Sequence, residues 1–203
     1  MKVGRCTGIW FLIATALLVL TGVAWRSAQP QAVLSVTPRT LKVKVGERTT
    51  VDLTIEQVSQ LYGAEIHLSF DPSVLEVVDA DPAVEGVQIE PGTFPIPDFV
   101  VQNAADNRTG TIDYASTQLP PNKPGEGKGV VARVTFRAKK AAVSPVQFEQ
   151  FLLADTQGGS IKATPQHGQI RVLGTPIWAF AVAAGLIVLG VAGGVWLALA
   201  RRK

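Results

Sequence analysis

Short segments in which apolar and polar residues alternate fill the middle of this chain. Val51, Leu53 and Ile55 alternate with polar neighbours, and the same spacing recurs between Tyr62 and Phe70. A period of two residues is that of a β-strand with one face in a core and one face in solvent. Helical periodicity is nearly absent from this region. The pattern therefore predicts an all-β domain.

Gly, Pro, Asn and Asp separate these segments, as turns between strands require. About nine short strands in about 140 residues predict a β-sandwich with jelly-roll or Greek-key connections. The expected strands are 41–45, 51–55, 62–70, 74–78, 99–103, 111–117, 129–138, 146–154 and 169–173. In the stretch F-D-P-S-V-L-E-V-V, Asp71-Pro72 is expected to end a strand and turn the chain, because proline cannot donate to a ladder.

Two apolar segments without charge flank this region. The first, from Cys6 to Trp25, follows Lys2 and Arg5 and is typical of a signal peptide. If it is not cleaved, it serves as an N-terminal anchor. The second includes residues 177–200, which as a helix would rise about 36 Å and cross the hydrocarbon core of a bilayer.

Three basic residues at positions 201–203 follow the second segment, as in a positive-inside stop. We therefore expect a single-pass protein of the cell membrane whose domain faces the extracytoplasmic side. The expected parts are a signal peptide or N-terminal anchor in 1–28, the sandwich in 33–173, a short tether in 174–176, a transmembrane helix in 177–200 and a cytoplasmic basic tail in 201–203.

Charge and cysteine content limit which functions and which stabilising bonds the middle region can have. The whole chain has a formal charge of +3, but residues 33–174 contain 13 cations and all 16 acids, a net charge of −3. A basic nucleic-acid surface is therefore not predicted. The single cysteine is Cys6, so the domain has no disulfide and must be stabilised by packing.

Residues that could carry chemistry are few in this region. Its two histidines, His67 and His167, are not spaced as a metal pair, and there is no G-x-S-x-G or H-E-x-x-H motif, so we predict that it is not an enzyme. Four acids from Asp79 to Glu90 have part of the spacing of a calcium loop. Val84 occupies the position that needs glycine, which favours an ordinary solvated acidic loop.

An ordered series of segments resembles the cohesin domain. The segments are 43–55, then G-A-E-I-H-L-S-F-D-P-S-V-L-E-V-V (63–78), then N-R-T-G-T-I-D-Y-A (107–115), then 125–139, and finally D-T-Q-G-G-S-I with G-Q-I-R-V. The resemblance covers about residues 33–173. It implies a nine-stranded jelly-roll sandwich similar to bacterial cellulose-binding modules. It also implies a partner, the dockerin, whose own calcium loops hold it folded, so that the cohesin itself needs no cofactor.

The resemblance also implies where a dockerin would bind. In the family, the dockerin packs on a flat sheet face that includes the strand before the Asp-Pro turn, with Asn or Asp often projecting where this chain has Gly63 and Glu65. Glu65 keeps an acceptor, whereas Gly63 removes one. The expected protein-binding face consists of Gly63, Glu65, His67, Asp113, Gln147 and Glu149.

Two other functions remain open at this point. A carbohydrate-binding module would use exposed planar aromatics, but all four tryptophans lie in or beside the flanks, so association with polysaccharide is expected to be indirect. A structural or adhesive surface domain without dockerin binding is the other alternative. The expected function is a cell-surface module that docks dockerin-bearing proteins in polysaccharide breakdown.

Overall fold

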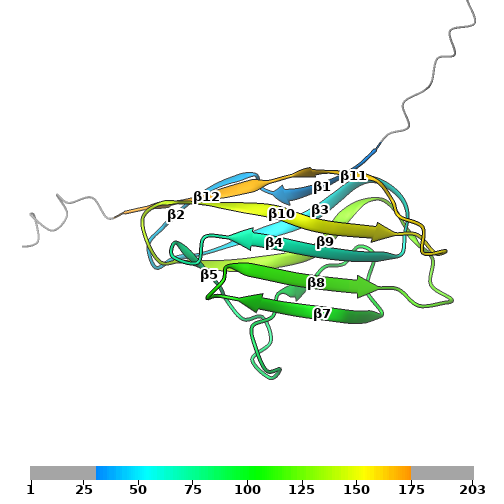
Figure 1. Cartoon of the computed structure of the whole chain (residues 1–203), viewed down its shortest axis with the longest axis horizontal. Coiled ribbons are helices and arrows are strands. Elements are labelled where there is room, and N and C mark those ends of the chain that lie inside the picture. The colour runs from blue at the N-terminus through cyan, green and yellow to red at the C-terminus, as the bar shows by residue number, and fades with distance from the viewer. Residues whose placement is uncertain (1–30, 175–203) are drawn as a thin grey trace, which may run out of the picture. The chain divides into compact units, whose positions relative to one another are not determined.

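The computed structural model describes residues 31–174, and the following account concerns those residues (Figure 1). The expected segments 1–28, 177–200 and 201–203 lie outside the described residues, and Gly174 is the one residue of the expected tether that lies inside them. Between residues 31 and 174 there is no helix long and apolar enough to cross a membrane.

Twelve strands form two sheets of six, which Figure 1 shows as stacked layers. Sheet A has the order β11-β1-β3-β9-β5, with β6 also paired to β9, and sheet B has the order β2-β12-β10-β4-β8-β7. The strands are β1 (Ala32–Thr37), β2 (Thr40–Lys44), β3 (Arg48–Leu61), β4 (Gly63–Phe70), β5 (Leu75–Val77), β6 (Glu90–Pro91), β7 (Phe99–Asp106), β8 (Thr111–Thr117), β9 (Gly125–Ala138), β10 (Val143–Ala154), β11 (Ala163–Gln166) and β12 (Gly168–Leu173).

The alternation in the sequence sets which side of each strand faces the core between the sheets. On β4, the residues Ala64, Ile66, Leu68 and Phe70 are all buried, and they alternate with the outward residues of the strand. Phe70 packs edge-on against Phe136 of the opposite sheet, with ring centroids 5.3 Å apart. The all-β sandwich predicted from the period of two is therefore confirmed.

The structure contains three strands beyond the nine expected, and these three have weak sequence patterns. β1 has a nearly continuous buried run rather than an alternation, β6 has two residues and β11 has four. β3 also extends past its predicted end at Ile55, through irregular pairing at which Gln57 and Gln60 have positive φ values of 55° and 60°. Irregularities of this kind interrupt the period on which the prediction depended.

Two segments cross from sheet A to sheet B side by side. β1 runs parallel to β11 in sheet A, and β2 runs parallel to β12 in sheet B. The crossings occur at Pro38–Arg39 and at His167, and the Gln169 N–H donates to the Arg39 carbonyl at 2.8 Å. The first and last parts of the domain are thereby joined in both sheets.

The Asp71-Pro72 segment is a structural corner, as predicted. Phe70, Val74 and Leu75 around it are 5%, 2% and 0% exposed, so all three fill the core. The Asp71 carboxylate accepts hydrogen bonds from the Ser73 backbone N–H at 2.8 Å and from the Ser73 hydroxyl at 2.7 Å. These two bonds lower the pKa of Asp71.

Candidate protein-binding face

The outward side of four adjacent strands, β10, β4, β8 and β7, forms a continuous surface that we call the docking face. The register places Gln150, His67, Asp113 and Ala104 in one row across the four strands, and Leu152, Glu65, Ala115 and Gln102 in the next row. Residues in one row are direct cross-strand neighbours. Glu65 and His67 of β4 are thus brought together with Asp113 of β8.

His67 lies between two carboxylates at the centre of the docking face. Its Nδ1 is 2.5 Å from Oδ1 of Asp113 and its Nε2 is 2.9 Å from Oε1 of Glu65. The hydrogen bond with Asp113 raises the pKa of His67 most, and the hydrogen bond with Glu65 raises it further. The protonated ring can donate to both carboxylates, which leaves the three side chains with one net negative charge.

Gly63 lies on β4 opposite Thr117, beyond Glu65 on the same face. A Cβ at this position would meet the Ser116 carbonyl and the Thr117 Oγ1 at 3.5 Å, which is ordinary van der Waals contact. The backbone therefore does not require glycine here. The absence of a side chain leaves this end of the face without the polar group that the resemblance implied.

Gln147 and Glu149 lie on β10, but neither is the cross-strand partner of His67. Gln147 pairs with Ser69, and an irregularity in register between Phe148 and Gln150 leaves Glu149 without a partner residue on β4. The Glu149 carboxylate instead accepts a hydrogen bond from the Ser69 hydroxyl at 2.5 Å. The bulge brings the next residue, Gln150, opposite His67.

Exposed apolar residues on the docking face were missed by the sequence interpretation. Leu152 pairs with Glu65 and is 48% exposed, and Phe99 on β7 is 58% exposed. Val101, in a second register irregularity on β7, is 62% exposed. The adjacent polar pair Glu149-Gln150 was the available signal, since it breaks the alternation and moves every later residue to the other face.

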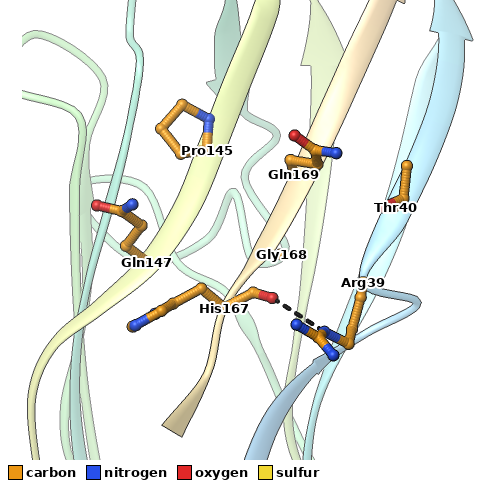
Figure 2. Close-up of a pocket in the computed structure, with 7 residues that line it drawn as sticks. All are labelled: Arg39, Thr40, Pro145, Gln147, His167, Gly168 and Gln169. Atoms are coloured by element: carbon orange, nitrogen blue, oxygen red, sulfur yellow. Dashed lines mark hydrogen bonds between the residues drawn. The ribbon is translucent and has the colours of Figure 1, made fainter.

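A pocket of about 460 Å³ adjoins the docking face where the chain crosses between the sheets (Figure 2). It is lined by Arg39, Thr40, Pro145, Gln147, His167, Gly168 and Gln169. The Phe148 N–H donates to Nδ1 of His167 at 3.1 Å, and the Arg39 Nε donates to the His167 carbonyl at 3.5 Å. His167 therefore links β10 to the segment at Arg39 through hydrogen bonds. Gln147 lines this pocket.

The acidic loop before β7 uses its carboxylates for its own backbone. Oδ1 of Asp79 accepts from the N–H groups of Asp81 and Gln88 at 3.2 and 3.0 Å, and Oδ1 of Asp81 accepts from the Ala83 N–H at 3.2 Å. Glu90 instead pairs with Arg133 at 2.9 Å. Within residues 31–174, no group of three or more His, Cys, Asp or Glu side chains could hold a metal ion.

Comparison with known structures shows the same sandwich in other proteins. A type II cohesin domain from the cellulosome of Acetivibrio cellulolyticus superposes with a TM-score of 0.60 at 21% identity, covering 70% of this chain and 95% of that one. A non-cellulosomal cohesin from the archaeon Archaeoglobus fulgidus gives a TM-score of 0.57 at 17% identity, covering 71% and 92%. A type I cohesin–dockerin complex from Clostridium thermocellum gives 0.55 at 14% identity, covering 71% and 100%.

Sequence comparison identifies the family. Cell surface glycoprotein 1 of Acetivibrio thermocellus is 26% identical over 123 residues, which cover 53% of this chain and 5% of that protein. The chain thus spans about one-twentieth of the length of this curated relative. Residues 34–172 match the family described as the cohesin domain, whose members are non-catalytic scaffolding modules. The chain belongs to the cohesin domain family.

Proposed function

We propose that this protein is a membrane-tethered cohesin whose docking face binds a dockerin. The observation that carries the proposal is the composition of that face, where exposed Leu152 and Phe99 lie on the same surface as the Glu65–His67–Asp113 cluster. Apolar anchors surrounded by oriented polar groups are typical of protein interfaces. Solved relatives of the same fold include cohesin–dockerin complexes.

The carboxylates supply acceptors that a partner can reach. His67 engages Oε1 of Glu65 and Oδ1 of Asp113, so the second oxygen of each carboxylate is available to donors of a partner. Glu65 is 48% exposed and Asp113 is 37% exposed. Because His67 holds both side chains in place, less rotamer entropy is lost when a partner binds.

Tethering to the membrane is supported by the sequence outside the described residues. The uncharged segment 177–200 is long enough to span a bilayer, and three basic residues follow it. The relative from Acetivibrio thermocellus is described as a cell surface glycoprotein. The proposed arrangement displays the cohesin outside the cell, where it captures secreted proteins that carry dockerins, such as enzymes of polysaccharide breakdown.

Calorimetry with a fragment of residues 31–174 tests the proposal, since this fragment contains all twelve strands and the core. The fragment is titrated with dockerins encoded in the same genome, first with calcium and then with a chelator. We expect binding that is lost on chelation, because calcium loops hold the dockerin folded. Absence of heat with every dockerin, from a folded fragment, would contradict the proposal.

A double variant assigns the binding to the docking face. Glu65→Ala with Asp113→Ala is expected to weaken dockerin binding at least tenfold, which corresponds to about 1.4 kcal/mol. Glu56→Ala with Glu85→Ala removes the same number of charges from exposed positions elsewhere and serves as the matched control. Equal affinities of the two folded double variants would remove the carboxylate cluster from the interface.

Direct carbohydrate binding remains the second candidate, and the structure gives it one supporting residue. Phe99 is the aromatic residue among the exposed large hydrophobic residues of the described domain, whereas Tyr114 is 1% exposed. A single ring offers little area for stacking on a sugar chain. We therefore propose that any association with polysaccharide goes through the dockerin partner, and a glycan screen would follow if no dockerin binds.

A further inference from the structure

Five cations and three exposed apolar side chains gather where the chain leaves the sandwich at Gly174. We call this surface the exit patch and define it by Lys42, Lys44, Val45, Lys139, Lys140, Val143, Arg171 and Leu173. We propose that the exit patch contacts the anionic phospholipid headgroups of the membrane to which the chain is tethered. This inference rests on the tether in the proposed function, and it does not depend on the dockerin.

The register places the members of the exit patch side by side. Arg171 of β12 pairs with Lys42 of β2 on one side and with Val143 of β10 on the other, and Leu173 pairs with Lys44. The Val45 N–H donates to the Leu173 carbonyl at 3.2 Å.

The loop between β9 and β10 brings two more lysines to this end of the sandwich. Its residue Ala142 accepts a hydrogen bond from the Val172 N–H at 2.8 Å. A Cβ on Gly174 would lie 3.3 Å from the Cβ of Ala141, so the exit point touches the same loop. Lys139 and Lys140 precede these residues and are exposed, and the Lys139 ammonium group donates to the Pro72 carbonyl at 2.7 Å.

Charge is distributed unevenly between the exit patch and the rest of the domain. The patch contains five of the 13 cations of residues 33–174, and two acids, Glu47 and Asp71, lie beside it. Glu47 accepts from the Lys44 backbone N–H at 3.0 Å, and Lys140 and Lys139 contribute to the lowered pKa of Asp71. The remaining eight cations are outnumbered by 14 acids. The patch is therefore a local positive surface on a domain of net negative charge.

Exposed apolar residues among these cations give the patch the character of an interfacial surface. Val45, Leu173 and Val143 are 44%, 42% and 40% exposed. Lysines on the edge strand β2 would by themselves discourage pairing with another sheet. Arg171 lies on the neighbouring strand and Lys139 and Lys140 lie in a loop, so edge protection does not account for the whole group. Cations with apolar side chains between them are the pattern of surfaces that lie on anionic lipid.

The short connection to the apolar segment brings the exit patch within electrostatic range of the membrane. Residues 174–176 can span at most about 10 Å before residue 177. This length is close to the Debye length of about 8 Å at physiological ionic strength, so headgroup charges would be only partly screened. The patch residues of β2, β12 and the first residue of β10 lie toward one edge of sheet B, and β7 of the docking face is the opposite edge.

Vesicle flotation of the 31–174 fragment tests the patch without the tether. The fragment is expected to float with vesicles of phosphatidylcholine and phosphatidylglycerol, and not with vesicles of phosphatidylcholine alone. Lys44→Glu with Lys140→Glu is expected to reduce the partition coefficient at least tenfold. Lys123→Glu with Lys162→Glu makes the same change in net charge at exposed positions elsewhere and is expected to have little effect.

Two results would overturn the proposal. One is no flotation of the folded fragment with phosphatidylglycerol vesicles, and the other is an equal loss in both double variants, which would show a response to net charge alone. The tether is tested separately by alkaline extraction of membranes that contain the full chain. Release of the chain by alkali would contradict the proposed membrane tether. The flotation result would still decide whether the patch binds anionic lipid.

Discussion

The outward faces of the two sheets differ in how completely their polar groups are paired. On sheet A, Arg133 of β9 contacts Asp52 of β3 at 2.8 Å and Glu90 of β6 at 2.9 Å, and Arg137 pairs with Glu76. On sheet B, the carboxylates of Glu65 and Asp113 share one histidine, His67. Leu152 and Phe99 are exposed on the same face.

The paired charges on sheet A and the unpaired groups on sheet B indicate which face is available to a partner. Cross-strand pairs of opposite charge on sheet A satisfy each other, so a partner would have to displace them to gain contacts. On the docking face, free carboxylate oxygens and exposed apolar side chains gain contacts only when a partner covers them. Charges that pair with each other are typical of an ordinary solvated sheet. Unpaired polar groups beside exposed apolar side chains are typical of a surface that binds a partner.

The largest loss of dockerin affinity is expected when a charge replaces the exposed apolar residue Leu152 on the docking face. Leu152→Asp removes a side chain that is 48% exposed and sets a carboxylate opposite Glu65. Dockerin affinity is expected to fall by about 30-fold or more, or about 2 kcal/mol, as for a central interface residue. Calorimetric titration measures this change.

The matched control places the same charge on sheet A. Thr50→Asp lies at an exposed position of β3 and is expected to leave dockerin affinity unchanged. Both variants should unfold within about 1 kcal/mol of the parent, because the substituted side chains are exposed. A loss of affinity in Thr50→Asp as large as in Leu152→Asp would abolish the distinction between the faces.

A smaller and pH-dependent effect is expected from His67. Its pKa in the folded domain is raised above the ordinary value of 6.5 by Asp113 and then by Glu65. The stabilisation is therefore fully present below pH 6.5 and is lost as the pH rises through the raised pKa. Urea unfolding at a series of pH values should show this loss in the parent and not in His67→Gln.

His167→Gln is the control for the histidine. Nδ1 of His167 accepts a backbone hydrogen bond, so this variant is expected to be less stable at every pH. It retains the His67 cluster and should retain the pH-dependent part of the stability. An identical pH profile in the parent and in His67→Gln would show that the cluster does not couple to folding.

Breaking the pairs on sheet A is expected to change stability and leave binding intact. Arg133→Ala removes two partly exposed ion pairs, which together contribute about 1 kcal/mol at low salt and less at high salt. Chemical denaturation at two salt concentrations measures the loss. A drop in dockerin affinity beyond about threefold would mean that sheet A takes part in docking.

The smallest changes in stability and dockerin affinity are expected from a substitution at Gly63. Asn at this position fits without strain, since the nearest atoms to its Cβ lie at 3.5 Å. Gly63→Asn should raise stability by up to about 0.5 kcal/mol through the unfolded state. Its dockerin affinity should change only a few-fold, in a direction set by the partner. A large loss of stability would show that this position tolerates no side chain.

Local sequence patterns predicted the parts of the fold that depend on neighbouring residues. The strand Thr111–Thr117 agrees with the predicted bounds, and alternation on β4 and β8 placed Glu65, His67 and Asp113 outward. Their mutual contacts also require that β4 and β8 be adjacent in register. The resemblance to cohesins placed the three residues on one sheet face, but the adjacency and register of β4 and β8 are given only by the structure, since a period of two cannot supply them.

The parts that sequence reasoning missed depend on irregular pairing and strand order. The bulge on β10 brings Gln150 and Leu152 outward, whereas uninterrupted alternation after Gln147 would have turned both inward. Phe99 and Val101 are exposed partly because β7 is an edge strand, and strand order is decided by contacts distant in sequence. Both features add apolar area to the docking face that composition did not indicate.

Chemical-shift mapping of isotope-labelled residues 31–174, titrated with a dockerin and calcium, tests the central claim most directly. The account predicts that the shifted amides concentrate on β10, β4, β8 and β7, with Glu65, His67, Asp113 and Leu152 among them. Shifts concentrated on the outward face of sheet A, around Asp52 and Arg133, would contradict it.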